Sequence, residues 1–256
     1  MKKTFALVLL IVLSGTGFSQ SLILKSPDGK LQVQVKIGEQ ISYSVTHEQT
    51  EVLASSPISM SLSNGTVWGK NPKLRNQKTN SVKQIIPTPI YKKSDIQDHY
   101  NELVLNFKGN YSLIFRAYDE GVAYRFVSTS HDELFIANEV VTLNFSQDRP
   151  AIVPYVRDFD RNNFKNQFFN SFENTYSHLR LSELNQDRMM FLPLVVELND
   201  GKKLCFTEAD LESYPGLYMI NRTGKTSLTG LFAPYPKKTV QGGHNELQQL
   251  VTEQED

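Results

Sequence analysis

The sequence predicts an all-β protein in which two large antiparallel sheets pack against each other. Short runs of apolar residues alternate with polar residues at a period of two, as they do in half-buried strands. Turn-forming Gly, Asn and Asp residues separate these runs at intervals of roughly 8–12 residues, which is typical of sandwiches and barrels. The expected strands number about twice those of a seven-stranded sandwich, so two large sheets are the simplest arrangement.

The first strands carry the clearest signal. Residues 31–37 alternate between apolar and polar side chains, Gly38 and Glu39 form a hairpin turn, and residues 41–45 repeat the alternation. Further strands are expected at residues 59–62, 103–107, 111–118, 122–127, 139–145, 192–198, 203–206, 217–220 and 227–232.

Two stretches, residues 69–93 and 155–185, are expected to be long loops, and helical signals are limited to one turn at 182–185. Long irregular loops in compact domains are often functional. The aromatic residues of the second loop have two interpretations. They could stack on sugar rings, but burial in the core gains more free energy and is the favoured interpretation. These residues are Tyr155, Phe159, Phe164, Phe168, Phe169, Phe172 and Tyr176.

The composition excludes several classes of protein. The chain has 256 residues, a formal net charge of zero, 39% hydrophobic residues and 11% aromatic residues. This content is sufficient for a buried core and unlike that of a disordered chain. Balanced charge without a long basic run argues against nucleic-acid binding. The only cysteine, Cys205, allows no intrachain disulfide and is interpreted as a small buried apolar residue at a strand centre.

The N-terminus predicts export from the cytoplasm. Lys2 and Lys3 precede a short apolar run at residues 5–13, and small residues follow it. This pattern is typical of a signal peptide comprising residues 1–19, cleaved between Ser19 and Gln20. The apolar run is shorter than the about 20 residues that cross a bilayer, so no membrane span is expected. The alternative is an uncleaved N-terminal anchor. The mature protein is expected to be periplasmic or secreted.

The acidic segment after residues 203–206 is the main candidate site. An apolar strand delivers Glu208 at its end, Asp210 and Glu212 follow, and the chain turns at Pro215 and Gly216. A carboxylate held by a strand end suits a hard cation such as Ca²⁺, although a solvated acidic turn is the simpler interpretation.

Other candidate motifs are incomplete. Residues 158–163 resemble a calcium loop, but Asn163 and Phe169 stand where Gly and the bidentate Glu are required, so a polar surface loop is expected. The sequence has no nucleophile elbow, zinc-protease motif or phosphate loop, and its histidines lack metal-ligand spacing. No catalytic residue is therefore assigned, and no substrate-binding residue can be named.

Several segments together resemble the N-terminal domain of glycoside hydrolase family 97. The hairpin at residues 115–126 is similar to one in that domain. So are residues 207–211 with Tyr214 and Pro215, residues 233–236, and the opening at residues 26–30 with the strand that follows it. The resemblance covers essentially the whole mature chain, and the ordered set of segments is more specific than the hairpin alone.

The resemblance implies a galactose-mutarotase-like β-super-sandwich, residues 20–243, followed in family members by a (β/α)₈ barrel. Members are secreted or periplasmic exo-acting α-glucosidases and α-galactosidases of Bacteroidetes with Ca²⁺ in the active site. The barrel supplies the catalytic acid and the base or nucleophile, and the sandwich supplies one calcium ligand from a Glu-Ala-x-Leu motif. In this sequence the motif begins at Glu208, which is thereby implied as a metal ligand.

The chain departs from the family pattern at its end. Residues 244–256 are expected to start a helix or linker toward a catalytic barrel that this sequence does not contain. The fragment is therefore expected to be inactive and to need that barrel, as well as an oligosaccharide substrate, as partners. Sugar specificity and stereochemistry remain open. The rival interpretation is a free-standing, non-catalytic carbohydrate-binding sandwich, and a weaker one is a periplasmic scaffold without a ligand.

Overall fold

The structure is a computed structural model that describes residues 19–157, 160, 162–169, 172–212 and 214–242 and, for the backbone alone, 249–254. Strands dominate the described residues. No helix among them has the length and apolar character that crossing a lipid bilayer requires. The expected signal peptide lies outside the described residues except for Ser19.

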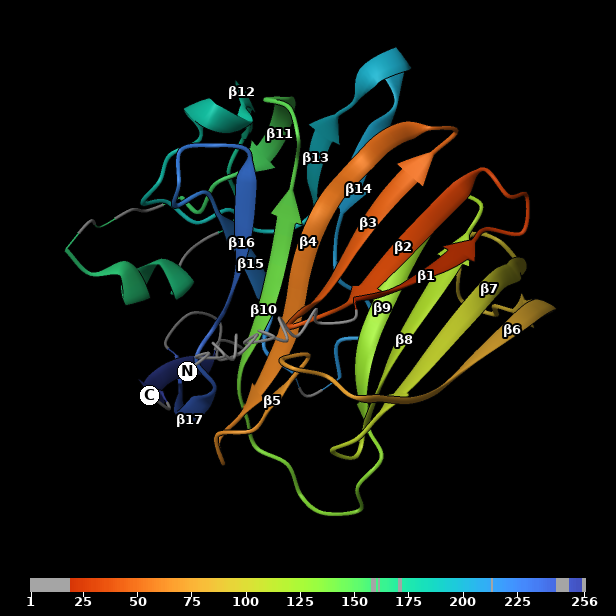
Figure 1. Ribbon diagram of the computed structural model, residues 1–256. Helices are drawn as coiled ribbons and strands as arrows, with labels where there is room; N and C mark the ends of the chain where they lie inside the picture. The colour runs from red at the N-terminus through yellow and green to blue at the C-terminus, as the bar shows by residue number, and fades with distance from the viewer. Residues whose placement is uncertain are drawn as a thin grey trace, which may run out of the picture.

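The main sheet has eight antiparallel strands and contains both the start of the domain and its late strands (Figure 1). Its order is β1 (Gln20–Lys25), β2 (Leu31–Ile37), β3 (Ile41–His47), β4 (Thr50–Leu62), β10 (Ile136–Asn144), β16 (Ser227–Phe232) and β15 (Leu217–Ile220), with β5 (Val67–Trp68) paired to β4. β10 crosses over to pair with β4, which places late strands beside early ones.

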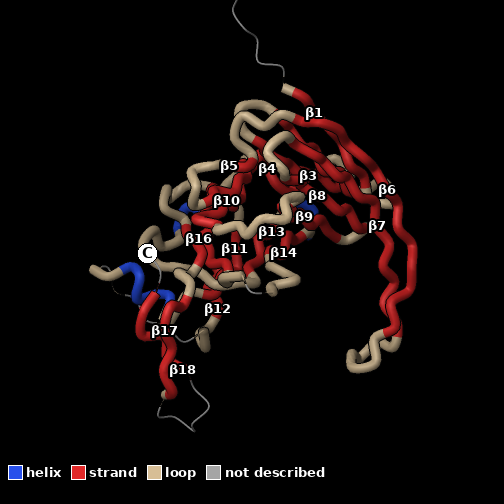
Figure 2. Tube along the Cα trace, turned by 90° about the horizontal axis from the view of Figure 1, so that it is seen from below, coloured by secondary structure: helices blue, strands red, loops and turns tan. Residues whose placement is uncertain are grey.

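A second sheet of four antiparallel strands covers the main sheet where β1 and β2 lie (Figure 1). It runs in sequence order through β6 (Leu74–Pro87), β7 (Asp95–Phe107), β8 (Tyr111–Tyr118) and β9 (Gly121–Ser128). The β6–β7 hairpin extends well beyond β8 and β9 (Figure 2). Two facing antiparallel sheets confirm the predicted all-β sandwich.

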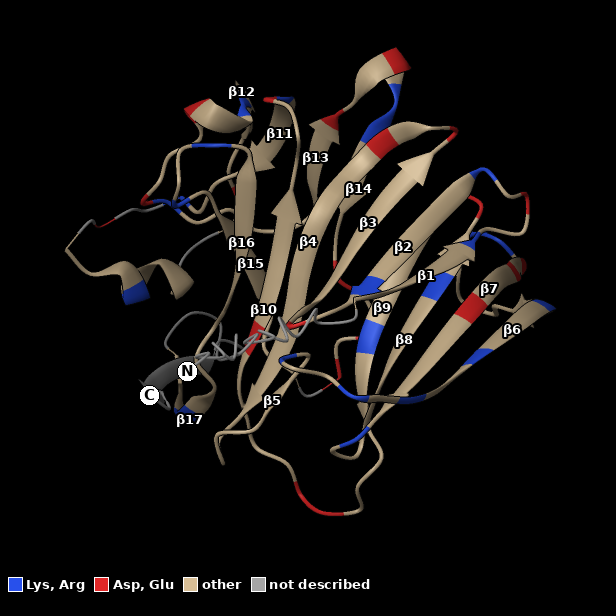
Figure 3. Ribbon diagram, in the orientation of Figure 1, with Lys and Arg blue, Asp and Glu red and all other residues tan. Residues whose placement is uncertain are grey.

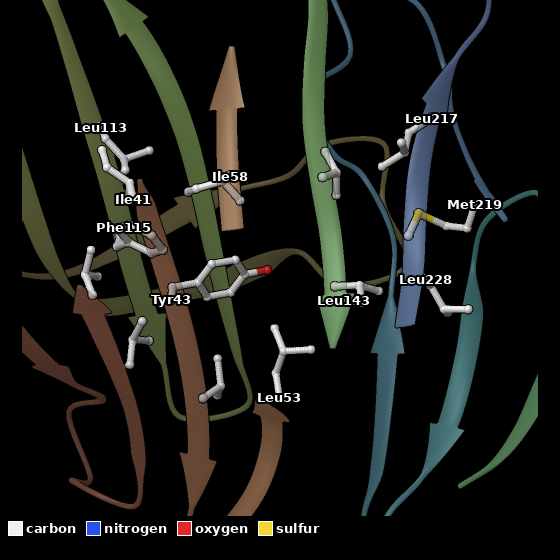
Figure 4. Packing of buried hydrophobic residues seen from close by; sticks show 14 of the residues in the cluster. Ile41, Tyr43, Leu53, Ile58, Leu113, Phe115, Leu143, Leu217, Met219 and Leu228 are labelled. Atoms are coloured by element: carbon white, nitrogen blue, oxygen red, sulfur yellow. The ribbon is translucent and has the colours of Figure 1, made fainter. Parts of the chain in front are cut away.

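The core fills the space between these sheets (Figure 4). Ile41 and Tyr43 from β3 lie opposite Leu113 and Phe115 from β8, and the rings of Tyr43 and Phe115 are 5.6 Å apart. Ile41, Leu113 and Phe115 are fully buried. The alternating apolar residues of each strand point into this space, because side chains on a strand alternate between its two faces.

A third sheet extends the core beyond β15 and β16. Its order is β12 (Tyr176–Arg180), β11 (Pro150–Pro154), β13 (Leu194–Glu197) and β14 (Lys203–Phe206). Met190 and Met219 exchange two backbone hydrogen bonds of 2.8 Å, which connect this region to β15. Three short 3₁₀ helices complete the region: η1 (Phe164–Phe168), η2 (Leu181–Glu183) and η3 (Asn199–Gly201).

Two expectations about the chain's organisation are wrong. The loop expected at residues 69–93 contains β6, a strand of 14 residues. A helix is wrong for residues 249–254, which form β18 (Gln249–Gln254) in a hairpin with β17 (Pro236–Gln241), while the expected connection toward a barrel stays a prediction. The β-branched pair Val251 and Thr252 favours a strand there, and the pairing with β17 supplies its backbone hydrogen bonds.

Charged side chains occur mainly at the ends of strands and on the outer parts of the β6–β9 sheet (Figure 3). Glu102 on β7 and Arg116 on β8 lie opposite each other in the register and form an ion pair of 2.9 Å. The other face of this sheet is buried in the core. The ion pair therefore favours a single register between β7 and β8.

Candidate metal-ligand site beside β14 and β15

Glu208 lies two residues beyond the end of β14 and is half-buried. Its two carboxylate oxygens both lie within hydrogen-bond distance of the backbone nitrogen of Leu217, at 3.2 and 3.1 Å. Leu217 is the first residue of β15. A Cβ atom placed on Gly216 would lie 3.7 Å from Glu208 Oε1, in ordinary van der Waals contact, so the turn passes directly beside the acid. The carboxylate is therefore held between two strands.

Glu139 on β10 lies close enough to Glu208 for the two charges to interact. Burial raises the pKa of Glu139, and the negative charge of Glu208 raises it further. A hydrogen bond from Tyr214 acts in the opposite direction and lowers the pKa. Tyr214 donates this hydrogen bond to Glu139 Oε2 at 2.9 Å. Burial likewise raises the pKa of Glu208, with the hydrogen bond from Leu217 as the opposing effect. Two partly desolvated carboxylates of this kind form a site that a cation would stabilise.

An aromatic cluster from the irregular segment borders this site through Tyr218 of β15. Phe168 and Phe172 pack on the ring of Tyr218, with centroid distances of 5.2 and 5.8 Å. Burial raises the pKa of Tyr218, and the charge of Glu208 adds to the rise. Phe172 also packs against Phe191 at 5.3 Å and keeps 45% of its surface exposed. The acid therefore lies next to exposed apolar surface.

Comparisons with known proteins decide the family. A model of the glycosyl-hydrolase 97 N-terminal family matches residues 24–252. This chain belongs to the glycoside hydrolase 97 family, as its N-terminal domain. It is 48% identical, over its whole length, to a retaining alpha-galactosidase of Bacteroides thetaiotaomicron. The resemblance found in the sequence is thus confirmed.

Solved structures share the fold. A glycoside hydrolase family 97 enzyme from Pseudoalteromonas sp. strain K8, in complex with acarbose, matches with a TM-score of 0.70 and 18% identity. That match covers 84% of this chain and 32% of the other. A beta-arabinopyranosidase matches with a TM-score of 0.71 and 21% identity, over 83% of this chain and 35% of the other. This chain spans only 39% of the Bacteroides enzyme, so it corresponds to the N-terminal part of a longer relative.

The residues of this family 97 domain fit part of a calcium site. Ca²⁺ takes six to eight oxygen ligands, whereas the described residues contain no group of three or more Asp, Glu, His or Cys side chains placed to hold a metal. Glu208 and Glu139 offer up to four carboxylate oxygens, three of which accept protein hydrogen bonds: both Glu208 oxygens from the Leu217 N–H and Glu139 Oε2 from Tyr214. A third acidic ligand would have to come from outside the described residues.

The structure separates the three acids of the predicted motif. Asp210 is exposed and forms a 3.3 Å ion pair with Arg125 of β9, and Glu212 is exposed. Glu208 alone of the three is partly buried and faces β15. Glu139 was not identified from the sequence, because it lies inside a predicted strand. It comes near Glu208 because β10 pairs with β16 and β16 pairs with β15.

Three other expectations have mixed outcomes. The buried interpretation of Cys205 is wrong: the residue is exposed, because β14 is an edge strand and Cys205 points to its outer face. Of the loop aromatics, Tyr155 belongs to the core, whereas Phe169 and Tyr176 are 50% and 48% exposed. Phe159 lies outside the described residues, as do positions 158 and 161 of the calcium-like stretch at 158–163.

Proposed function

We propose that this chain is the N-terminal sandwich of a calcium-dependent, exo-acting retaining α-galactosidase that hydrolyses non-reducing-end galactosides. The observation that carries the proposal is the 48% identity, over the whole chain, to a retaining alpha-galactosidase. The structural relatives at 18–21% identity share the fold alone and give no preference between sugars. Galactosides are therefore favoured over glucosides. The sequence alone gave no preference between these two substrates.

The proposed role of the sandwich is to position one acid at the edge of an active site that the rest of the enzyme completes. Glu208 is oriented by the Leu217 N–H and partly shielded from water, as a metal ligand must be. Ca²⁺, when bound there, would stabilise negative charge that develops during hydrolysis. Tyr214, by bonding to Glu139, would fix the turn that carries Glu208, and Glu139 would add negative charge beside it.

The pair of carboxyl groups that a retaining glycosidase needs would lie in the part of the enzyme beyond this chain. The aromatic cluster around Tyr218 is proposed to face that part, because Phe172, which packs on Tyr218, keeps 45% of its surface exposed. The protein is further proposed to be exported, with cleavage between Ser19 and Gln20, on the strength of its N-terminal sequence.

The test compares this 256-residue chain with the protein translated from the complete reading frame. Each is assayed on chromogenic α-galactosides and α-glucosides, with and without a calcium chelator. The proposal predicts hydrolysis of the galactoside by the complete protein, loss of that activity with chelator, and no activity in the short chain. A reading frame that ends at Asp256, or a preference for glucosides, would contradict it.

The rival function is a carbohydrate-binding module, which the exposed rings of Phe169 and Tyr176 favour. It predicts that the short chain alone binds α-galactosyl oligosaccharides with measurable heat in titration calorimetry. Replacing Phe169 and Tyr176 together by Ala would then abolish the binding. No heat in the short chain, together with activity in the complete protein, would exclude the module.

A further inference from the structure

A small pocket lies at the opposite end of the β8 strand from the β8–β9 turn, between the segment after β5 and the β7–β8 turn. Its volume is about 220 Å³. Its walls include Trp68, Lys70, Asn71, Lys73, Lys108 and Tyr111. None of these residues belongs to the Glu208 site, so what the pocket binds is independent of the proposed function.

Trp68 forms an unusual part of this wall. The residue is only 4% exposed, and its Nε1–H has no hydrogen-bond acceptor among the described residues. The indole stacks on Tyr111 with a centroid distance of 5.1 Å and an interplanar angle of 9°, and Tyr111 stacks on Phe107 in turn. A buried indole N–H usually has a partner, and leaving one unpaired costs free energy. The nitrogen itself is shielded from solvent, so Trp68 is a buried ring beside the pocket whose surroundings a bound ligand would change.

The polar groups around the pocket are mostly hydrogen-bond donors. Lys70, Lys73 and Lys108 all line it with exposed side chains. No acidic residue is among the lining residues. Three ammonium groups without a lining carboxylate create a local positive potential, in a chain whose total formal charge is zero. Such a surface attracts anions.

Backbone hydrogen bonds hold in place the two segments that carry these lysines. Gly69 adopts a φ of +90° and donates its N–H to the Tyr111 hydroxyl at 3.2 Å, while its carbonyl accepts the N–H of Ile41 at 2.9 Å. Lys108 donates its N–H to the Lys73 carbonyl at 2.9 Å, which connects the two walls of the pocket. The pocket is therefore formed before any ligand arrives, which reduces the entropy that binding must overcome.

We propose that this pocket binds a small oxyanion: phosphate or sulfate, free in solution or carried as an ester on a sugar. The lysines would contact the anion through charge-assisted hydrogen bonds. The three lysine side chains, with no carboxylate among the lining residues, favour an anion over a cation or an apolar group. The volume accommodates one such group with part of a sugar ring.

The single tryptophan of the chain makes the test direct, because Trp68 is the only source of indole fluorescence. The chain is titrated at constant ionic strength with sodium phosphate, sodium sulfate, galactose 6-sulfate and neutral galactose. The proposal predicts a saturable change of indole emission with the anions and none with galactose. Equal affinity for sulfate and galactose 6-sulfate would identify a free ion as the ligand, and tighter binding of the ester a charged sugar.

Variants then locate the binding. Lys73→Ala with Lys108→Ala removes two of the three ammonium groups without touching the core, and affinity should fall by about tenfold or more. The matched control is Lys36→Ala with Lys83→Ala, two exposed lysines on β2 and β6, which should leave affinity unchanged. The proposal is overturned by the lack of any saturable change, by an equal response to galactose, or by unchanged affinity in the pocket variant.

Discussion

The hydroxyl of Tyr214 donates a hydrogen bond of 2.9 Å to Glu139 Oε2 and so joins the turn that follows β14 to β10. Glu139 is a partly buried carboxyl, and Tyr214 is the donor that opposes the effect of burial on its pKa. The turn that contains Glu208 is thus fixed at two points, one through Tyr214 and one through Leu217.

Tyr214→Phe tests the first of these points. The variant keeps the ring, which packs edge-on against Phe232 at 5.7 Å, and removes only the hydroxyl. Glu139 then loses its donor, so we expect the free energy of unfolding to fall by about 1–3 kcal/mol. Urea denaturation measures the loss. Tyr91→Phe, at an exposed position in the β6–β7 connection, is the control and should change stability by less than about 0.5 kcal/mol. Equal effects of the two substitutions would show that the Tyr214 hydrogen bond contributes nothing.

The Glu102–Arg116 pair predicts a pH-dependent contribution to stability. Burial alone would raise the pKa of Glu102, but hydrogen bonds from Asn80 and Arg116, at 3.0 and 2.9 Å, outweigh it and hold the pKa below its ordinary value. Because the pKa of Glu102 is lower in the folded than in the unfolded protein, its full contribution to the free energy of unfolding is present above the ordinary glutamate pKa. It is lost as the pH falls through the folded pKa.

Glu102→Gln removes this dependence. At neutral pH we expect the variant to be less stable by about 1–3 kcal/mol, because Arg116 loses its charged partner. The difference between the two proteins should shrink as the pH is lowered below the ordinary glutamate pKa. Thermal unfolding followed at a series of pH values measures both. A difference that stays constant, or grows, as the solution is acidified would contradict the assignment.

Gly69→Ala tests the backbone that forms the lysine-lined pocket. At a φ of +90°, an added Cβ atom would lie 2.9 Å from the carbonyl oxygen of Ile58. Gly65 has a similar φ of +85° but nothing within 4 Å of its Cβ position, so Gly65→Ala isolates the cost of φ alone. We expect Gly69→Ala to be less stable than Gly65→Ala by about 1–3 kcal/mol in urea denaturation. Equal losses would mean that the close approach to Ile58 is relieved at no cost.

Strand prediction succeeded where alternation and burial coincide. The residue ranges expected for β2 and β8 agree with the structure, because alternate residues in both strands are buried. β6 was missed for the opposite reason: nearly all of its residues are exposed, so its sequence carries no apolar period. The pairing with β7 along its length, which local sequence cannot reveal, keeps it extended.

The candidate site was predictable only in part. Glu208 could be selected from its place at a strand end and from the resemblance in the surrounding motif. Glu139 could not, because it approaches Glu208 through the order of strands in the main sheet, which depends on tertiary pairing. Cys205 was misplaced because its apolar neighbours, Leu204 and Phe206, concealed that β14 lies at a sheet edge.

The proposed role of Glu208 as a calcium ligand is tested by the affinity of the complete protein for Ca²⁺. Isothermal titration compares the unchanged protein with Glu208→Gln, which preserves shape and removes the charge. Glu212→Gln, in the same turn but exposed, is the control. The account predicts Ca²⁺ binding at least about tenfold weaker in Glu208→Gln and unchanged in Glu212→Gln. Equal affinity in all three proteins would contradict it.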